Sequence, residues 1–130
     1  MSETPDDLRY SKSHEWVRTN ADGTATVGIT DHAQEQLGDL VYVEVPEADR
    51  ELAAGDACAV VESVKAASDV YAPIAGSVVA GNEALADSPE VVNSDPYGSG
   101  WLLKLRPADA AAVNALMNAS EYQAFVESEE

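Results

Sequence analysis

The sequence predicts a mainly β protein: an antiparallel β-sandwich with a short helix after its first hairpin and helices at its C-terminal end. Short segments rich in β-branched and apolar residues alternate with turns of Gly, Pro, Asn and Asp, as is typical of antiparallel sheets. The stretch 109–127 instead carries apolar side chains at helical spacing. A chain of 130 residues has the length of one domain, which is expected to span 1–130.

The expected strands are short and separated by turn residues such as Asp22-Gly23, a good hairpin dipeptide. They follow a polar segment, residues 1–8, that is expected to be flexible. Residues 81–89 are expected to form a loop. The expected strands cover residues 14–18, 24–29, 40–45, 57–63, 66–71, 77–80, 91–92 and 101–105.

The helices are predicted from capping signals. Thr30 or Asp31 is expected to cap the short helix, which Gly38 ends, and Asp31 and Gln34 have the spacing of a capping box. In the C-terminal stretch, Ser120 and Gln123 have the same spacing. The apolar side chains of that stretch are expected to face the core.

Acidic residues dominate the charge of the chain. Twenty-four acidic residues outnumber seven basic ones, for a formal net charge of −17. Phosphate contacts need clusters of Lys and Arg, so nucleic acid and acidic membrane surfaces are excluded as partners. The acids are mostly scattered, as on a surface adapted to concentrated salt, and this suggests a halophilic source; a strongly basic partner is the alternative explanation.

The chain is expected to act in the cytoplasm. It has no apolar stretch long enough to span a membrane, and its acidic N-terminus does not resemble a secretory signal. The single cysteine, Cys58, lies in an apolar run, which predicts a buried side chain.

No catalytic constellation is evident, and the protein is not expected to be an enzyme. The two histidines lack metal-ligand spacing, so no metal site is predicted; His14 is expected to be structural, and His32 to be a surface or packing residue. The chain also lacks a Gly-x-Ser-x-Gly elbow and a Gly-rich phosphate loop.

Lys65 stands out because it lies between two expected strands, 57–63 and 66–71, at the tip of a hairpin. The chain otherwise avoids lysine, having only Lys12 and Lys104 besides. A primary amine at a rigid, exposed tip is accessible to a modifying enzyme without unfolding of the domain. The position therefore suits covalent attachment of a carrier group through an amide, which removes the lysine charge.

The sequence around Lys65 resembles the lipoylation motif of glycine cleavage system H proteins. The resembling run, residues 60–69, reads Val-Val-Glu-Ser-Val-Lys-Ala-Ala-Ser-Asp. Other segments resemble further signatures of that family in the same order: residues 10–17, 27–34, 37–39, 71–76, 93–97 and 100–102. The resemblance therefore covers nearly the whole chain.

The resemblance implies a barrel-sandwich hybrid fold, as in lipoyl and biotinyl carriers, with lipoate bound covalently to Lys65. It also implies that Glu62 helps the lipoate-attaching enzyme to recognise the chain. Ser13, Glu15 and Asp69 are implied to form a cleft for the arm loaded with an aminomethyl group.

The implied partners are a glycine decarboxylase (P protein), an aminomethyltransferase (T protein) that uses tetrahydrofolate, and a dihydrolipoyl dehydrogenase (L protein). A monomeric carrier would move the aminomethyl group of glycine between them and catalyse none of the steps.

Two other functions remain open. One is a relay that donates lipoate to other proteins through the same lysine, and the other is a β-sandwich binding module in which Lys65 is inert. Other carriers fit less well, because biotin carriers place methionine on both sides of the lysine and lipoyl domains of 2-oxoacid dehydrogenases place Asp before it. Here the neighbours are Val64 and Ala66.

The net charge predicts that the fold is more stable in salt. A formal charge of −17 destabilises the compact state by self-repulsion, and at 1 M salt the screening length falls to about 3 Å. The melting temperature should therefore rise between dilute buffer and molar KCl. A melting temperature that stayed flat over this range would contradict the prediction.

Overall fold

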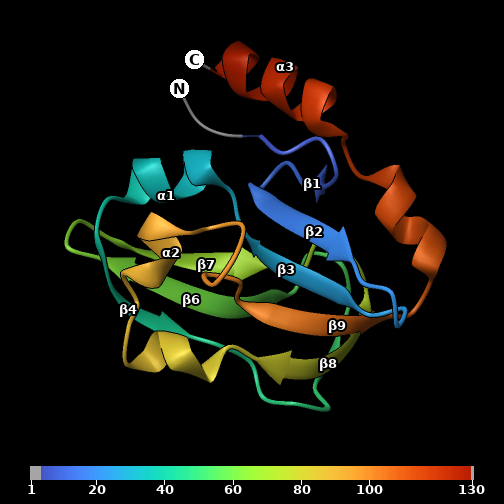
Figure 1. The fold of residues 1–130 in the computed structure, drawn as a ribbon, viewed down its shortest axis with the longest axis horizontal. Coiled ribbons are helices and arrows are strands. Elements are labelled where there is room, and N and C mark those ends of the chain that lie inside the picture. The colour runs from blue at the N-terminus through green and yellow to red at the C-terminus, as the bar shows by residue number, and fades with distance from the viewer. Residues whose placement is uncertain (1–3, 130) are drawn as a thin grey trace.

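A computed structural model describes residues 4–129, which form two antiparallel sheets packed face to face (Figure 1). One sheet has six strands in the order β1-β2-β3-β9-β8-β5, and the other has three in the order β4-β6-β7. The predicted antiparallel β-sandwich is therefore confirmed. The strands are β1 (Arg9–Tyr10), β2 (Glu15–Thr19), β3 (Ala25–Ile29), β4 (Leu40–Glu44), β5 (Glu51–Leu52), β6 (Ala57–Ser63), β7 (Ala67–Tyr71), β8 (Gly76–Gly81) and β9 (Leu103–Pro107).

Short helices lie around the sheets. A short helix follows the first hairpin and further helices close the C-terminal end, as predicted. In Figure 1, α3 lies above β1 and α1 lies toward the β6–β7 end of the molecule. The helices are α1 (Asp31–Leu37), the 3₁₀ helix η1 (Glu83–Ala86), α2 (Val91–Ser94), the 3₁₀ helix η2 (Ala110–Ala115) and α3 (Ala119–Glu129).

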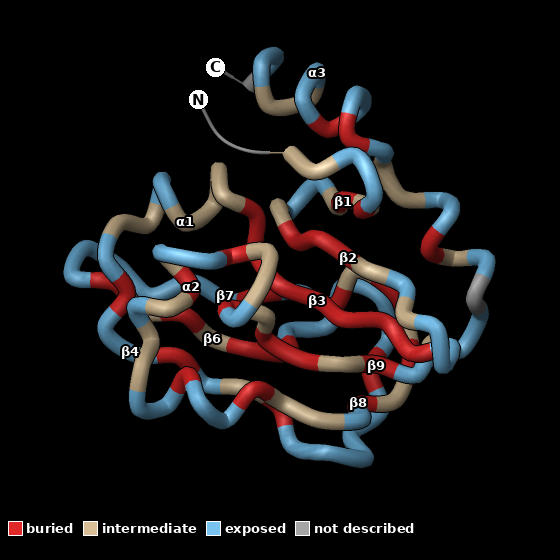
Figure 2. The backbone as a smooth tube through the Cα atoms, in the orientation of Figure 1, coloured by how far each residue is buried: buried red, intermediate tan, exposed pale blue. Residues whose placement is uncertain are grey.

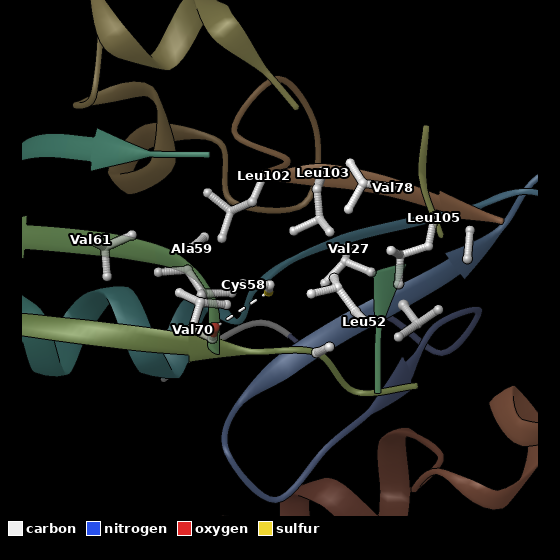
Figure 3. Packing of buried hydrophobic residues seen from close by; sticks show 14 of the residues in the cluster. Val27, Leu52, Cys58, Ala59, Val61, Val70, Val78, Leu102, Leu103 and Leu105 are labelled. Atoms are coloured by element: carbon white, nitrogen blue, oxygen red, sulfur yellow. Dashed lines mark hydrogen bonds between the residues drawn. The ribbon is translucent and has the colours of Figure 1, made fainter. Parts of the chain in front are cut away.

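The main core fills the space between the two sheets. Val27, Leu103 and Leu105 from the six-stranded sheet are fully buried, and Val61 and Val70 from the other sheet pack in the same cluster (Figure 3). Figure 2 shows this burial along the central strands, with exposed residues at the ends and loops. Burying these side chains supplies the main driving force for holding the sheets together.

Cys58 belongs to this core, as predicted. It is 3% exposed, and its Sγ donates a hydrogen bond to the carbonyl of Val70 at 3.3 Å. Burial raises the pKa of the Cys58 thiol to about 12. The thiol is therefore protonated and unreactive in the folded protein.

A second, aromatic cluster joins α3 to the outer face of the first sheet. Trp16 and Tyr122 are buried, and Leu8, at the end of the segment for which flexibility is expected, is 2% exposed. Gly28 makes room for Trp16, because a Cβ at this position would lie 2.7 Å from the indole ring. The C-terminal helix is thereby fixed against the first hairpin.

The prediction of a strand at residues 91–92 is wrong, because these residues begin helix α2. The Asp95 amide donates to the Val91 carbonyl at 2.8 Å, and Val92 is fully buried. Valine pairs favour strands only where a neighbouring strand can pair with them, and packing here selects a helical turn instead. The loop expected over 81–89 contains η1, whose Leu85 is buried.

The capping boxes also differ from those predicted. Thr30 caps α1 by accepting from the Ala33 amide, whereas Asp31 and Gln34 bond to each other side chain to side chain and not as a reciprocal box. At α3, the reciprocal box joins Asn118 and Glu121, with both bonds at 2.9 Å, in place of the expected Ser120 and Gln123.

The reason is that α3 begins at Ala119, so Asn118 occupies the cap position. Strands β1 and β5 are absent from the sequence prediction, because two residues are too few to show an alternating pattern.

Candidate functional site

The β6–β7 hairpin places Lys65 at an exposed tip. The buried Ser63 closes the turn: its amide donates to the Ala66 carbonyl at 2.8 Å, and its hydroxyl accepts from the amides of Lys65 and Ala66 at 3.1 Å. The Val64 amide bonds to the Asp39 carbonyl, tying the tip to the start of β4. The tip is thus rigid in its backbone, while the Lys65 side chain faces outward.

The Lys65 side chain lies over the end of α1. A Cβ added to Gly38, the C-cap of that helix, would lie 3.3 Å from Lys65 Cε. Gly38 has φ +85°, which favours glycine, so the residue provides both the helix end and the space. The partial negative charge at the helix C-terminus favours a cation there.

A cleft of about 500 Å³ begins beside this position, between α1 and the hairpin. The structure brings Ser13, Glu15 and Asp69 together in its lining. The lining does not include Lys65 or Glu62. It does include Ser68, three residues after Lys65 in the chain, and Leu37, which precedes the Gly38 that lies beside the Lys65 side chain. An arm attached to Lys65 could therefore extend along the cleft toward Glu15.

Glu15 is the most buried polar group of the cleft, with 1% of its surface exposed. Its Oε1 accepts from the hydroxyls of Ser11 and Ser13, both at 2.6 Å, and its Oε2 accepts from the Tyr71 amide at 3.4 Å. Burial raises the pKa of the Glu15 carboxyl, although these hydrogen bonds act to lower it. The cleft thus holds a buried carboxyl whose charged form is disfavoured by burial and favoured by its three hydrogen bonds.

A sharp turn before β2 creates this arrangement. His14 has φ +70°, an unusual conformation for a residue other than glycine. The turn is held by a bond from the His14 amide to the Ser11 carbonyl and another from the Thr30 amide to the His14 carbonyl. It brings the hydroxyls of Ser11 and Ser13 to the same oxygen of Glu15.

Asp69 and Glu62 differ from Glu15 in their surroundings. Asp69 is exposed on edge strand β7, at the open side of the cleft. Glu62 is half-buried on β6, opposite Tyr42 of β4 and away from the cleft lining. Glu44 and, to a lesser extent, Glu62 raise the pKa of the Tyr42 hydroxyl, so this surface is strongly acidic.

Sequence reasoning missed two histidines that line the cleft and one serine that bonds to Glu15 from outside the lining. His14, expected to be structural, and His32, expected to be a surface or packing residue, both line the cleft, with ring centroids 5.0 Å apart. Ser11 was not singled out, although its spacing from Ser13 and Glu15 is regular enough to have indicated a shared role. The approach of the histidines depends on α1 folding back over the turn, which local sequence does not reveal.

Residues 4–129 contain neither a group of metal ligands nor a helix that could cross a membrane. No three His, Cys, Asp or Glu side chains of this part of the chain are grouped as metal ligands. No helix within it is long and apolar enough to cross a membrane.

Comparison with known proteins identifies the family. The family model described as "Glycine cleavage H-protein" matches residues 8–129. Curated glycine cleavage system H proteins from Halorhodospira halophila (strain DSM 244 / SL1) and Cronobacter sakazakii (strain ATCC BAA-894) are 62% and 60% identical over 129 residues. These matches cover 99% of this chain, and 99% and 100% of the two relatives.

The crystal structure of a glycine cleavage system H protein from Mycobacterium marinum is also similar. It superimposes with a TM-score of 0.85 at 43% identity, and the match covers 95% of this chain and 98% of that one. The range matched by the family model includes the hairpin, the residues that line the cleft and α3. The chain therefore belongs to the glycine cleavage H-protein family.

Proposed function

We propose that this protein is the lipoyl carrier of a glycine cleavage system and that lipoate is attached through an amide to Lys65. The observation that carries the proposal is an exposed lysine on a rigid tip, beside a cleft that contains a buried carboxylate. The amine needs no rearrangement of the backbone to be accessible, so the residues present fit the group.

The chain's own residues hold and protect the cargo. Lipoate, once bound, supplies the sulfur chemistry that accepts the aminomethyl group of glycine. Glu15 and Asp69 would accept hydrogen bonds from the cationic amine of the cargo, and Ser13, which lines the same cleft, would add a hydroxyl. An amine held against the cleft lining would be less accessible to water, which can release the aminomethyl group.

The family implies that the carrier serves the other components of the system. We propose glycine decarboxylase, aminomethyltransferase and dihydrolipoyl dehydrogenase as its partners, a monomeric state, and the cytoplasm as its location. The scattered acids support adaptation to concentrated salt, and one similar protein comes from Halorhodospira halophila while another comes from Cronobacter sakazakii.

Simple measurements distinguish the two alternative functions, a lipoate relay and a binding module, from the carrier function. A lipoate relay would transfer the lipoyl group from this chain to an unmodified acceptor protein. A binding module with an inert lysine would keep its unmodified mass after expression with lipoate and an attaching enzyme.

Lys65 should be the only lipoylated residue. Intact mass after expression with lipoate should show one lipoyl group on the wild type and none on Lys65→Arg, which should retain the melting temperature because the tip is exposed. Lys12→Arg and Lys104→Arg are the controls and should be modified like the wild type. Lipoate mapped to Lys12 or Lys104 would contradict the assignment.

Glu62→Gln should slow lipoylation several-fold without changing stability, because Glu62 lies near the tip on a face that a modifying enzyme must approach. Initial rates with purified attaching enzyme measure the effect. Glu44→Gln removes the same charge from the same acidic surface and should matter less. Equal initial rates of lipoylation for Glu62→Gln and the wild type would show that Glu62 is an ordinary solvated side chain with no role in recognition.

Glu15→Gln combined with Asp69→Asn should shorten the lifetime of the amine-loaded protein in the absence of transferase by about tenfold, since charge-assisted hydrogen bonds are lost. Lipoylation should be unaffected. Glu44→Gln with Asp87→Asn removes two charges elsewhere and serves as the matched control. A double variant at Glu15 and Asp69 that retained its cargo as long as the wild type would rule out these carboxylates.

The protection should also depend on pH. Because burial raises the pKa of Glu15, its carboxylate is lost at a higher pH than that of an ordinary glutamate, about 4.3. The lifetime should therefore shorten as the pH falls through this raised value. The free energy of unfolding depends on pH in the opposite sense. The contribution of the protonated Glu15 carboxyl is fully present below about pH 4.3 and is lost as the pH rises through the raised pKa. Glu15→Gln should remove this pH dependence of stability.

A further inference from the structure

A side-chain amide on α2 ties the end of α1 to the start of β4. Asn93 Nδ2 donates to the Gly38 carbonyl and to Gln34 Oε1, both at 2.9 Å, and its Oδ1 accepts from the Leu40 amide at 2.9 Å. These partners lie 53 to 59 positions away in the sequence. Asn93 opens the segment 93–97, a family signature to which the function proposed above gives no role.

Backbone groups fix the orientation of this side-chain amide. A backbone N–H donates and a carbonyl accepts, so the Leu40 amide must face Oδ1 and the Gly38 carbonyl must face Nδ2 of Asn93. Gln34 is oriented in the same way, because its Nε2 donates to Asp31 Oδ1 at 2.6 Å and its Oε1 is thereby turned toward α2. The network therefore runs from the first turn of α1 to the first residue of β4.

The segment 38–40, which this amide holds, supports the tip of the β6–β7 hairpin. The Asp39 carbonyl accepts from the Val64 amide at 3.3 Å. Leu40 is 3% exposed and is the β4 partner of Ser63. The position of the tip relative to α1 and β4 therefore depends on where this segment lies.

Gly38 places the same segment under the Lys65 side chain. A Cβ at this position would lie 3.3 Å from Lys65 Cε, so the lysine stem rests on bare backbone. With φ +85° and ψ −162°, Gly38 has a conformation that favours glycine, and glycine has little conformational preference of its own. A hydrogen bond from outside the segment is therefore needed to fix its carbonyl, and Asn93 supplies it.

We propose that Asn93 is a positioning residue for lipoylation, which holds the hairpin tip in the place where the lipoate-attaching enzyme binds it. The proposal rests on the carrier function above and names a determinant of it that lies outside the hairpin. Asn93 acts through the segment 38–40, since its amide bonds to Gly38 and Leu40.

Loss of this support should change the affinity for the enzyme and not the chemical step. The bonds of Ser63 close the turn within the hairpin, so the turn can persist when the segment 38–40 moves. An enzyme that binds only the supported tip then meets a fraction of the molecules, and its apparent affinity falls by that fraction. The bound complex reacts as before, so the proposal predicts a higher KM at unchanged kcat.

Steady-state lipoylation, with the unmodified full-length chain as the varied substrate, tests the proposal. Asn93→Asp keeps an acceptor for the Leu40 amide but loses both donated bonds. Its KM should rise about fivefold while kcat stays at the wild-type value, since losing a net hydrogen bond shifts an equilibrium by about this factor. An unchanged KM, or a lower kcat at unchanged KM, would overturn the proposal.

Asn82→Asp is the matched control. Asn82 Nδ2 also donates two bonds, to the carbonyls of Ser99 and Trp101 at 2.9 Å and 2.8 Å, and neither partner belongs to the segment 38–40. This variant should lower the melting temperature, as Asn93→Asp does, but leave the KM unchanged. A KM raised as much as in Asn93→Asp would assign the effect to general loss of stability and overturn the proposal.

Asn93→Ala and Asn82→Ala repeat the comparison without an added charge. This pair separates positioning from repulsion between a new carboxylate and the enzyme, and it replaces the first pair should an aspartate variant not fold. Only Asn93→Ala should raise the KM. Equal KM values for the two alanine variants would overturn the proposal.

Hydrogen exchange of backbone amides tests the support of the tip without lipoate. In Asn93→Ala, the amides of Leu40 and Val64 should exchange about tenfold faster than in the wild type, because the segment 38–40 opens more often. The Ser63 amide, which bonds to the Ala66 carbonyl within the hairpin, should keep its rate. An unchanged rate at Val64, or an equal increase at Ser63, would overturn the proposal. Failure of the wild type to be lipoylated at Lys65 would instead overturn the carrier function, and the exchange result would still stand.

Discussion

The buried carboxylate of Glu15 is the constraint on which the site depends. A carboxyl group with 1% exposure needs donors, and the turn before β2 supplies the hydroxyls of Ser11 and Ser13. The third donor, the Tyr71 amide, belongs to β7, whereas Glu15 belongs to β2. This bond therefore joins the two sheets at the edge of the hairpin that carries Lys65, and it fixes one wall of the cleft relative to the other.

The backbone conformation at His14 is the structural cost of this arrangement. A left-handed conformation at a residue with a side chain costs about 1–2 kcal/mol, and two backbone hydrogen bonds and the packing of the imidazole offset it. Part of that packing comes from α3, through Phe125 and Tyr122. The C-terminal helix thus supports a residue of the cleft wall, His14, as well as covering the aromatic cluster.

The acidity of the protein has different consequences at short and long range. In concentrated salt, exposed charges interact over only about 3 Å, so the general negative field contributes little to attracting a cationic cargo. Direct hydrogen bonds to a buried carboxylate are screened much less. The proposed contact between the cargo and Glu15 should therefore be less sensitive to salt than attraction by the net charge of −17.

The sequence by itself determined the fold class, the α1 helix with its Gly38 end, and the position of Lys65 between β6 and β7, because these follow from local patterns of strands and turns. Resemblance to a family indicated Ser13, Glu15 and Asp69. Only the tertiary structure decided that residues 91–94 are helical and that His14, His32 and Tyr122 meet at the cleft. The physical reason is that these features depend on contacts between segments distant in the chain, which local propensity does not encode.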